Sequence, residues 1–320
     1  MGNHIWLENL NKGDRVDGYY ALSDAVIRQS KNGEDYLAGK LTDRTGSIML
    51  RVWSYGGPVD ETCNGSPVYV SGAVSEYNGE LQIKADVIRI PTDLEAGSYN
   101  ISDLVQTAPI DSEQTAINLL SIIDTSIMDN DYKAITKSIL KKHIEVFKTC
   151  PAAKSNHHAF VSGLLMHTYN MARVASMLAD AYWEVINKDL LLAGTILHDI
   201  CKVDEFELSN LGMVKSYTLK GNLLGHLAMG VAKIEEEAKL LGMPEEKMIL
   251  LQHLIASHHG RPEYGAILVP MCAEAQLLHL IDMIDSRMEV YSEAYQNINP
   301  GEFSQGRVKG LDNIIYRPSI

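Results

Sequence analysis

The hydrophobic pattern of this 320-residue chain changes near residue 91, and that change constrains the fold more than any other feature. Before it, five short runs of strand-forming residues alternate with turn signals, and Asn78-Gly79 joins two of these runs as a hairpin turn would. From Ile101 onward, apolar residues recur with helical spacing, and Asp111-Ser112 is a candidate helix cap. We therefore predict a multidomain α and β protein, with a small closed β-barrel before an all-α domain.

The change of pattern sets the predicted domain boundaries. The barrel is expected at residues 1–95, a linker at 96–110, the helical domain at 111–295 and an irregular tail at 296–320.

Composition limits the classes of binding partner and the cellular compartment that we expect. A net charge of −13 argues against a large basic surface for duplex nucleic acid, but not against single-strand binding, in which base stacking carries much of the affinity. The four cysteines lack metal-finger spacing and fit reduced thiols. The first residues lack a secretory pattern, and the apolar runs are too short to cross a bilayer. We expect a cytoplasmic protein with no membrane partner.

Histidines are concentrated in the helical part of the chain, where nine of the eleven lie between His157 and His279. They fall in five separated segments, two of which also carry aspartates. Imidazole and carboxylate are ligands that divalent transition metals share. A single core histidine bonded to a carbonyl is the simpler interpretation of any one position, but it does not account for the series. The pattern predicts a metal centre inside the helical domain.

His198-Asp199 is the strongest candidate within this series. On a helix, Lys202 lies one turn beyond the pair, so the three residues can share one edge. The apolar run before them would bury the helix, and a buried aspartate is rare unless it is paired or ligating. A carboxylate flanked by imidazoles can bridge two metal ions, the arrangement that serves attack of water on phosphate esters.

Sequence spacing gives less certain positions for the remaining candidate metal ligands. Adjacent histidines on a helix point about 100° apart, so His258 and His259 could both ligate only near a helix end, which Gly260 supplies. Asp282 lies on the last apolar helix with Asp285 one turn further on, and spacing alone does not choose between them.

These residues carry a resemblance to a known family. The order H…HD…H…HH…D resembles the HD-domain superfamily of metal-dependent phosphohydrolases. The segments HHAFVSGLLMHT, LHDICKV, LLGHLAMG, IASHHGRPEYGA and AEAQLLHLIDMIDSRM resemble the YhaM family of 3′–5′ exoribonucleases, over almost the whole chain. The resemblance implies an N-terminal OB-fold followed by an all-α HD domain. It also implies hydrolysis of single-stranded RNA to 5′-mononucleotides, with single-stranded DNA as a further substrate and a homo-oligomeric assembly.

The resemblance also implies roles for individual residues. Those that match ligands of the first metal are His167, His198, Asp199 and Asp282. Those that match ligands of the second are His226, His258 and His259, with Asp199 bridging the two ions. Asp199 and Lys202 are the expected catalytic residues, because Lys202 matches a lysine that contacts the scissile phosphate. Mixed histidine and aspartate ligation favours two Mn²⁺ ions, with Co²⁺ or Fe²⁺ as alternatives.

Further residues are candidates for substrate binding, each with a structural or solvated role as the alternative. Near the metal centre they are Lys154, His157, His158 and Arg261; in the barrel they are Tyr36 and Trp53 for stacking and Arg51 for phosphate. Two other functions stay open at this stage. One is an HD phosphohydrolase acting on free or cyclic nucleotides, and the other is a non-catalytic nucleic-acid-binding module.

Overall fold

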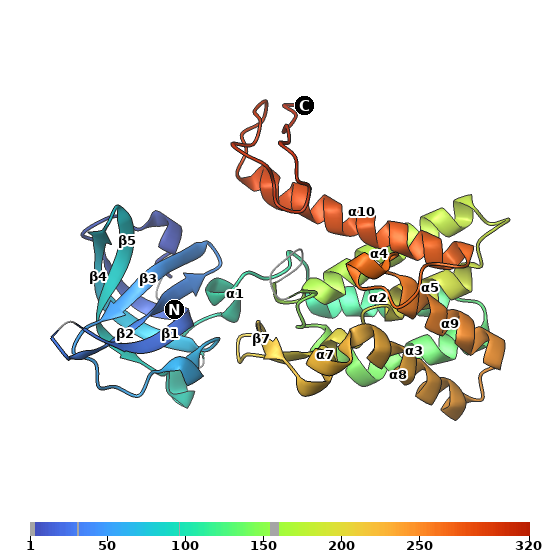
Figure 1. Cartoon of the computed structure of the whole chain (residues 1–320), viewed down its shortest axis with the longest axis horizontal. Coiled ribbons are helices and arrows are strands. Elements are labelled where there is room, and N and C mark those ends of the chain that lie inside the picture. The colour runs from blue at the N-terminus through green and yellow to red at the C-terminus, as the bar shows by residue number, and fades with distance from the viewer. Residues whose placement is uncertain (1–3, 31, 96, 154–159) are drawn as a thin grey trace. The chain divides into compact units, whose positions relative to one another are not determined.

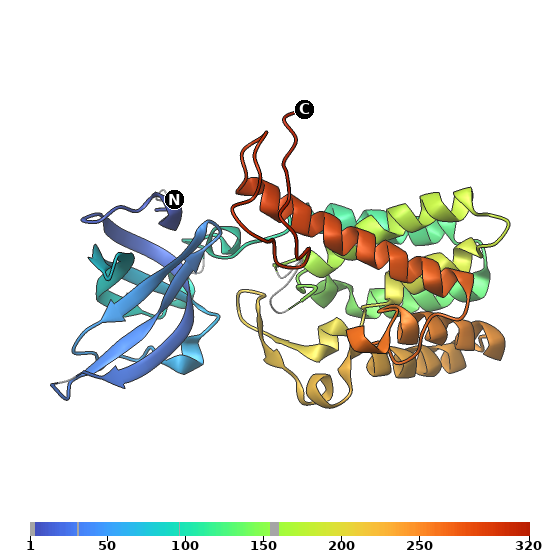
Figure 2. The ribbon, with the colours of Figure 1, turned by 45° about the horizontal axis from the view of Figure 1, so that its top comes forward.

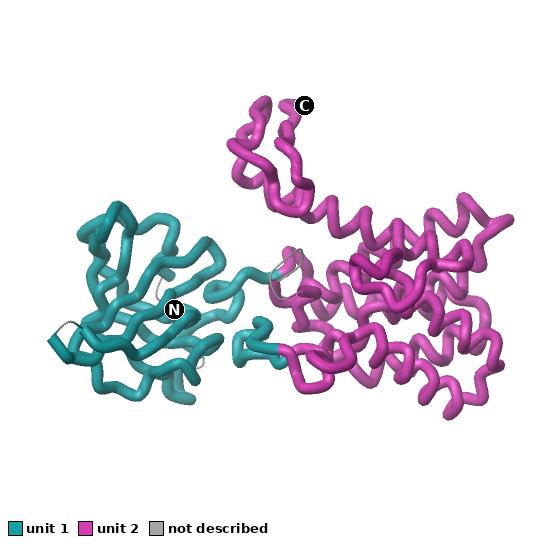
Figure 3. The backbone as a smooth tube through the Cα atoms, viewed as in Figure 1, with its two compact units in different colours: residues 1–107, 207–216 teal, residues 108–206, 217–320 magenta. Residues whose placement is uncertain are grey.

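The chain folds into two compact units, which Figure 3 shows in different colours. A computed structural model describes residues 4–30, 32–95, 97–153 and 160–320. The first unit comprises residues 1–107 and 207–216, and the second comprises residues 108–206 and 217–320. The domain boundaries drawn from the sequence at residues 95, 110 and 295 remain predictions.

The first unit is built on a closed five-stranded barrel (Figure 1). Its strands are β1 (Arg15–Gln29), β2 (Asp35–Asp43), β3 (Gly46–Val52), β4 (Pro67–Tyr77) and β5 (Glu80–Arg89). They follow the order β1-β2-β3-β5-β4, in which β3 and β5 are parallel and β4 closes the barrel on β1. This is an OB-fold-like barrel, and it confirms the fold predicted for the N-terminal part of the chain.

Alternating side chains fill the barrel, and turn chemistry sets the register. Along β4 every second residue from Val68 to Val74 is buried, as expected when one face of a strand forms the core. Asn78 and Gly79 have φ angles of 52° and 84°. Both are in the left-handed conformation that a two-residue type I′ turn requires at its two central positions. The hairpin predicted at Asn78-Gly79 is therefore present between β4 and β5.

The second unit is helical. Its helices are α2 (Ser112–Ser126), α3 (Asn130–Phe147), α4 (Gly163–Ala181), α5 (Lys188–Leu197), α6 (Lys202–Glu205), α7 (Leu219–Leu223), α8 (Gly225–Leu241), α9 (Glu245–Ser257) and α10 (Ala273–Gln296), while α1 (Ile101–Leu104) belongs to the first unit. The Asp111 carboxylate accepts a hydrogen bond from the Gln114 N–H and so caps α2, as predicted. Among the described residues, no helix combines the length and apolar character that a membrane span needs.

Helix α5 forms the centre of the helical unit. All its residues from Leu190 to Leu197 are buried, and it packs against α3, α4, α9 and α10. Figure 2 shows α10 running along this bundle. A Cβ atom on Gly194 would lie 2.3 Å from Leu254 Cδ2, so the glycine allows α5 and α9 to approach closely. The end of α5, where His198 follows, is therefore fixed deep inside the unit.

Two segments do not follow the helical pattern. Strands β6 (Phe206–Leu208) and β7 (Val214–Tyr217) form a hairpin that the sequence analysis did not anticipate, although Gly212 marks its turn with a φ of 76°. The C-terminal segment contains isolated β-bridges, between Phe303 and Tyr316 and between Val308 and Asn313.

Candidate metal centre

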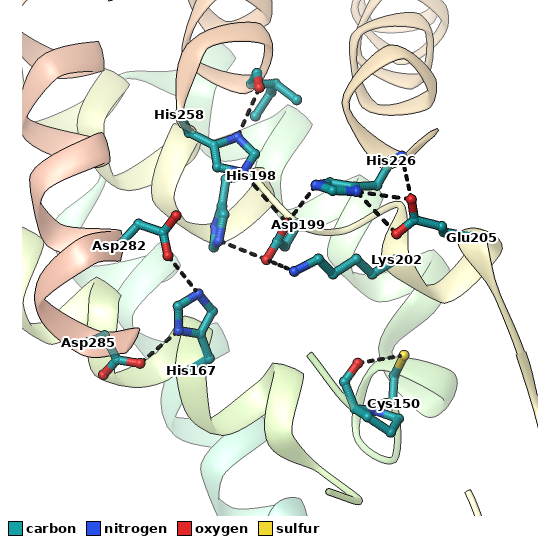
Figure 4. Close-up of polar contacts among 12 residues, drawn as sticks. Cys150, His167, His198, Asp199, Lys202, Glu205, His226, His258, Asp282 and Asp285 are labelled. Carbon is teal, nitrogen blue, oxygen red and sulfur yellow. Dashed lines mark hydrogen bonds and ion pairs between the residues drawn. The ribbon is translucent and has the colours of Figure 1, made fainter. Parts of the chain in front are cut away.

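Histidines and aspartates from separated helices converge inside the second unit (Figure 4). Three overlapping groups each place their potential ligand atoms within 4.8 Å of one another. The groups are His167, His198 and Asp282; His198, Asp199 and His258; and His226, His258 and His259. All seven residues predicted as metal ligands belong to at least one of these groups.

Helix ends and backbone carbonyls orient two of the imidazoles. His198 and His258 are the C-cap residues of α5 and α9. His198 Nδ1 donates to the Thr195 carbonyl at 2.7 Å, and His258 Nδ1 donates to the Ile255 carbonyl at 2.9 Å. Because each Nδ1 carries its proton toward the preceding turn, each Nε2 keeps a lone pair for an ion.

Asp199 lies between these imidazoles. Its Oδ2 is 3.2 Å from His198 Nε2, and its Oδ1 is 3.3 Å from His226 Nε2 and 3.6 Å from His258 Nε2. These contacts are short, yet they lack hydrogen-bond geometry. Within the part of the chain that the structure describes, the buried atoms left without a hydrogen-bond partner include His198 Nε2, Asp199 Oδ1, His226 Nε2, His258 Nε2 and His259 Nδ1.

These buried atoms without hydrogen-bond partners show whether the residues are suited to bind a metal ion. Each buried polar atom without a partner costs about 1–3 kcal/mol, and native proteins contain few of them. Here four imidazole nitrogens and one carboxylate oxygen are orphaned in the same place. This donor set fits divalent transition-metal ions, which would satisfy all of these atoms together.

The protonation states also suit ligands. Burial opposes the charge on Asp199, but Lys202, whose Nζ is 2.7 Å from Oδ2, together with His198 holds the pKa of Asp199 well below its usual range. Burial lowers the pKa of His258, and burial with the nearby His258 lowers the pKa of His259 to about 3. At neutral pH the aspartate is therefore ionised and these two imidazoles are neutral.

The contacts of His167 distinguish Asp282 from Asp285, the two candidate ligands between which sequence spacing could not choose. Its Nε2 is 3.4 Å from Asp282 Oδ1, and its Nδ1 is 2.7 Å from Asp285 Oδ2. Burial disfavours a charged His167, but its bonds to Asp282 and Asp285 outweigh burial and raise its pKa to about 10. Asp282 shares a group with His167 and His198, whereas Asp285 lies at the other ring nitrogen. This geometry favours Asp282 as the ligand and Asp285 as the residue that orients His167.

The predicted substrate-binding residues fall in three places. Arg261 is exposed, follows the His258-His259-Gly260 turn and has no ion pair with any of the described residues. In the barrel, the rings of Tyr36 and Trp53 stack with centroids 4.8 Å apart. Arg51 Nη1 donates to the Leu50 carbonyl at 2.8 Å. Lys154, His157 and His158 lie outside the described residues.

Glu205 is a polar residue at the centre that the sequence analysis missed. Its carboxylate is buried and contacts the backbone N–H and the ring of His226 (Figure 4). No spacing rule separates Glu205 from Asp204 and Glu207, which flank it and are exposed.

Comparisons with known proteins agree with this geometry. The HD domain family model matches residues 164–287, which include all seven candidate ligands. The TraI_2 helicase model matches residues 110–189, a stretch that ends before His198.

Three similar relatives, each named 3′-5′ exoribonuclease YhaM, match over 96% of this chain. The proteins of Halalkalibacterium halodurans, Shouchella clausii and Bacillus subtilis are 37%, 39% and 36% identical to it, over 94%, 95% and 96% of their own lengths. Among solved structures, the second OB-fold domain of Methanococcus maripaludis replication protein A covers 28% of this chain at 23% identity, with a TM-score of 0.20.

Proposed function

Because this chain belongs to the YhaM family of 3′–5′ exoribonucleases, we propose that its metal centre hydrolyses phosphodiester bonds at the 3′ end of single-stranded RNA and releases 5′-mononucleotides. The observation that carries the proposal is the set of buried, orphaned nitrogen and oxygen atoms around Asp199. A binding module without catalysis would have no need for such a costly arrangement.

The HD domain implies dependence on a divalent metal ion. In the proposed assignment, His167, His198, Asp199 and Asp282 would hold one ion, and His226, His258 and His259 would hold the other together with Asp199. When bound, such ions supply an activated water and neutralise charge on the phosphate. Two Mn²⁺ ions suit the mixed nitrogen and oxygen donors, with Co²⁺ or Fe²⁺ as alternatives.

The chain's own side chains would position the substrate. Lys202 stays cationic, since Asp199 outweighs burial and raises its pKa, and it can turn toward a phosphate oxygen beside the bridging carboxylate. Arg261 offers an exposed guanidinium two residues after His259. Burial raises the pKa of Cys150 and of Cys201 to about 12, so neither thiol is a ready nucleophile. These features favour direct attack by water over a covalent intermediate.

The barrel would hold the strand. Tyr36 lies in β2 and Arg51 in β3, two strands whose face binds oligonucleotides in OB-folds, and Trp53 directly follows β3. The Trp53 side chain is 52% exposed, and a ring this open can stack on a base. The proposal extends to single-stranded DNA as a further substrate, because stacking does not read the 2′-hydroxyl. It also includes assembly into a homo-oligomer and a cytoplasmic location.

Degradation of one RNA labelled at either end tests the function. With Mn²⁺, the 5′-labelled RNA should shorten one nucleotide at a time, and the 3′-labelled RNA should release a labelled mononucleotide at once. EDTA should stop both reactions. Asp199→Asn should abolish them, while Asp204→Asn, which alters an exposed carboxylate nearby, should not. Internal fragments, or degradation that persists in EDTA, would contradict the proposal.

A further inference from the structure

Glu205 is a buried carboxylate beside the metal centre, and it is not itself a member of any ligand group. Its side chain is only 8% exposed. Glu205 Oε1 accepts hydrogen bonds from the His226 backbone N–H and from His226 Nδ1, each at 3.1 Å, and Oε2 also lies 3.1 Å from Nδ1. Among the described residues, the hydrogen bonds of this carboxylate are all with His226.

His226 needs such a partner because of where it lies. His198 and His258 end their helices and donate Nδ1–H to a carbonyl three residues earlier. His226 is the second residue of α8, so its own helix offers no carbonyl one turn before it. Glu205 takes the place of that carbonyl. With the proton held on Nδ1, His226 Nε2 keeps its lone pair directed toward Asp199 Oδ1, 3.3 Å away.

The backbone is shaped around this contact. Gly225 has a φ of 71°, which turns the chain from α7 into α8 and brings the His226 N–H onto Glu205. A Cβ on Gly221 would lie 2.3 Å from the Glu205 carbonyl oxygen, so α7 packs directly on this residue. The carboxylate also lies at the N-terminus of α8, where a negative charge is favourable.

We propose that Glu205 is a positioning residue for the second metal ion, acting through His226. This inference rests on the proposed function and on the assignment of two ions. Among the described residues, the group His226, His258 and His259 consists of three imidazoles, and in the proposed assignment it shares the Asp199 carboxylate with the first ion. Glu205 adds a second negative charge through the His226 ring, which makes that imidazole a stronger donor. Within the described part of the chain, its hydrogen bonds reach His226 and not His167, His198 or Asp282.

Titration of chelator-stripped protein with Mn²⁺ tests this role without measuring catalysis. Calorimetry gives the affinity of each ion, and electron paramagnetic resonance distinguishes a single Mn²⁺ from a coupled pair. Wild type should bind two ions. Glu205→Gln should bind the first ion normally and the second about 10–100-fold more weakly, the usual effect of losing such a partner. Glu205→Asp keeps the charge on a shorter side chain and should weaken the second ion less.

Glu237→Gln is the matched control, because the Glu237 side chain is also 8% exposed but is bonded to Ser138 and Lys142. It should bind both ions as wild type does. In a His226→Ala background, Glu205→Gln should cause no further loss, since its effect passes through that ring. Normal binding of both ions by Glu205→Gln, equal weakening of both, or a further loss in the His226→Ala background would overturn the inference.

RNA degradation measured in parallel separates this inference from the proposed function. If wild type binds two ions but does not shorten RNA, the proposed function fails and the role of Glu205 stands. If wild type shortens RNA while Glu205→Gln binds both ions normally, only the inference about Glu205 fails.

Discussion

Removing the metal ions should lower the free energy of unfolding of the helical unit and therefore its Tm. Five buried polar atoms around Asp199 lack hydrogen-bond partners among the described residues. Ions that bind only the folded state stabilise it by mass action, each by about 2.7 kcal/mol when the free ion is about 100-fold above its Kd. Two ions therefore give about 5 kcal/mol. For a domain of this size, each kcal/mol shifts Tm by about 2–4 °C, so Mn²⁺ should raise Tm by about 10–20 °C over EDTA.

Thermal unfolding followed by circular dichroism measures this shift. The double variant His198→Ala with Asp199→Asn removes one donor of the first group and the bridging carboxylate, and it should lose most of the shift. Asp204→Asn should keep it. Equal Tm values for wild type in Mn²⁺ and EDTA would refute the reasoning, and so would a full shift in the double variant.

Three further substitutions test other parts of the account. Trp53→Ala should weaken binding of long single-stranded RNA by about 1–3 kcal/mol, measured by fluorescence anisotropy, with a smaller effect on a dinucleotide. Gly194→Ala should destabilise the protein by about 1–3 kcal/mol in urea unfolding, because the new methyl group would overlap Leu254. The bond from Lys142 lowers the pKa of Glu237, so its contribution to stability is full above its usual pKa and is lost as pH falls through the lowered value. The stability difference between wild type and Glu237→Gln should therefore shrink on acidification.

The sequence predicted the barrel because local chemistry determines it. Alternating apolar residues define the strand faces, and Asn78-Gly79 suits the type I′ turn, one of the two geometries that commonly join such strands in two residues. The convergence of these histidines and aspartates was also predictable, because buried polar residues in an apolar helical domain need a shared partner. Both conclusions depend on residue types and their spacing.

Other features depend on tertiary structure that no local pattern contains. Asp282 and Asp285 lie one turn apart on α10, and only the position of His167 between their oxygens distinguishes them. Glu205 lies in a run of acidic residues, and the packing of α7 decides that it alone is buried. The β6–β7 hairpin was missed because the surrounding helical pattern masked its short strands, although Gly212 was a readable turn signal.

Anomalous diffraction at the manganese absorption edge, from crystals grown with Mn²⁺, tests the central claim most directly. Two peaks are expected, one among His167, His198 and Asp282 and the other among His226, His258 and His259, with an Asp199 oxygen contacting each. Peaks elsewhere in the molecule, or ions that Asp199 does not contact, would contradict the claim.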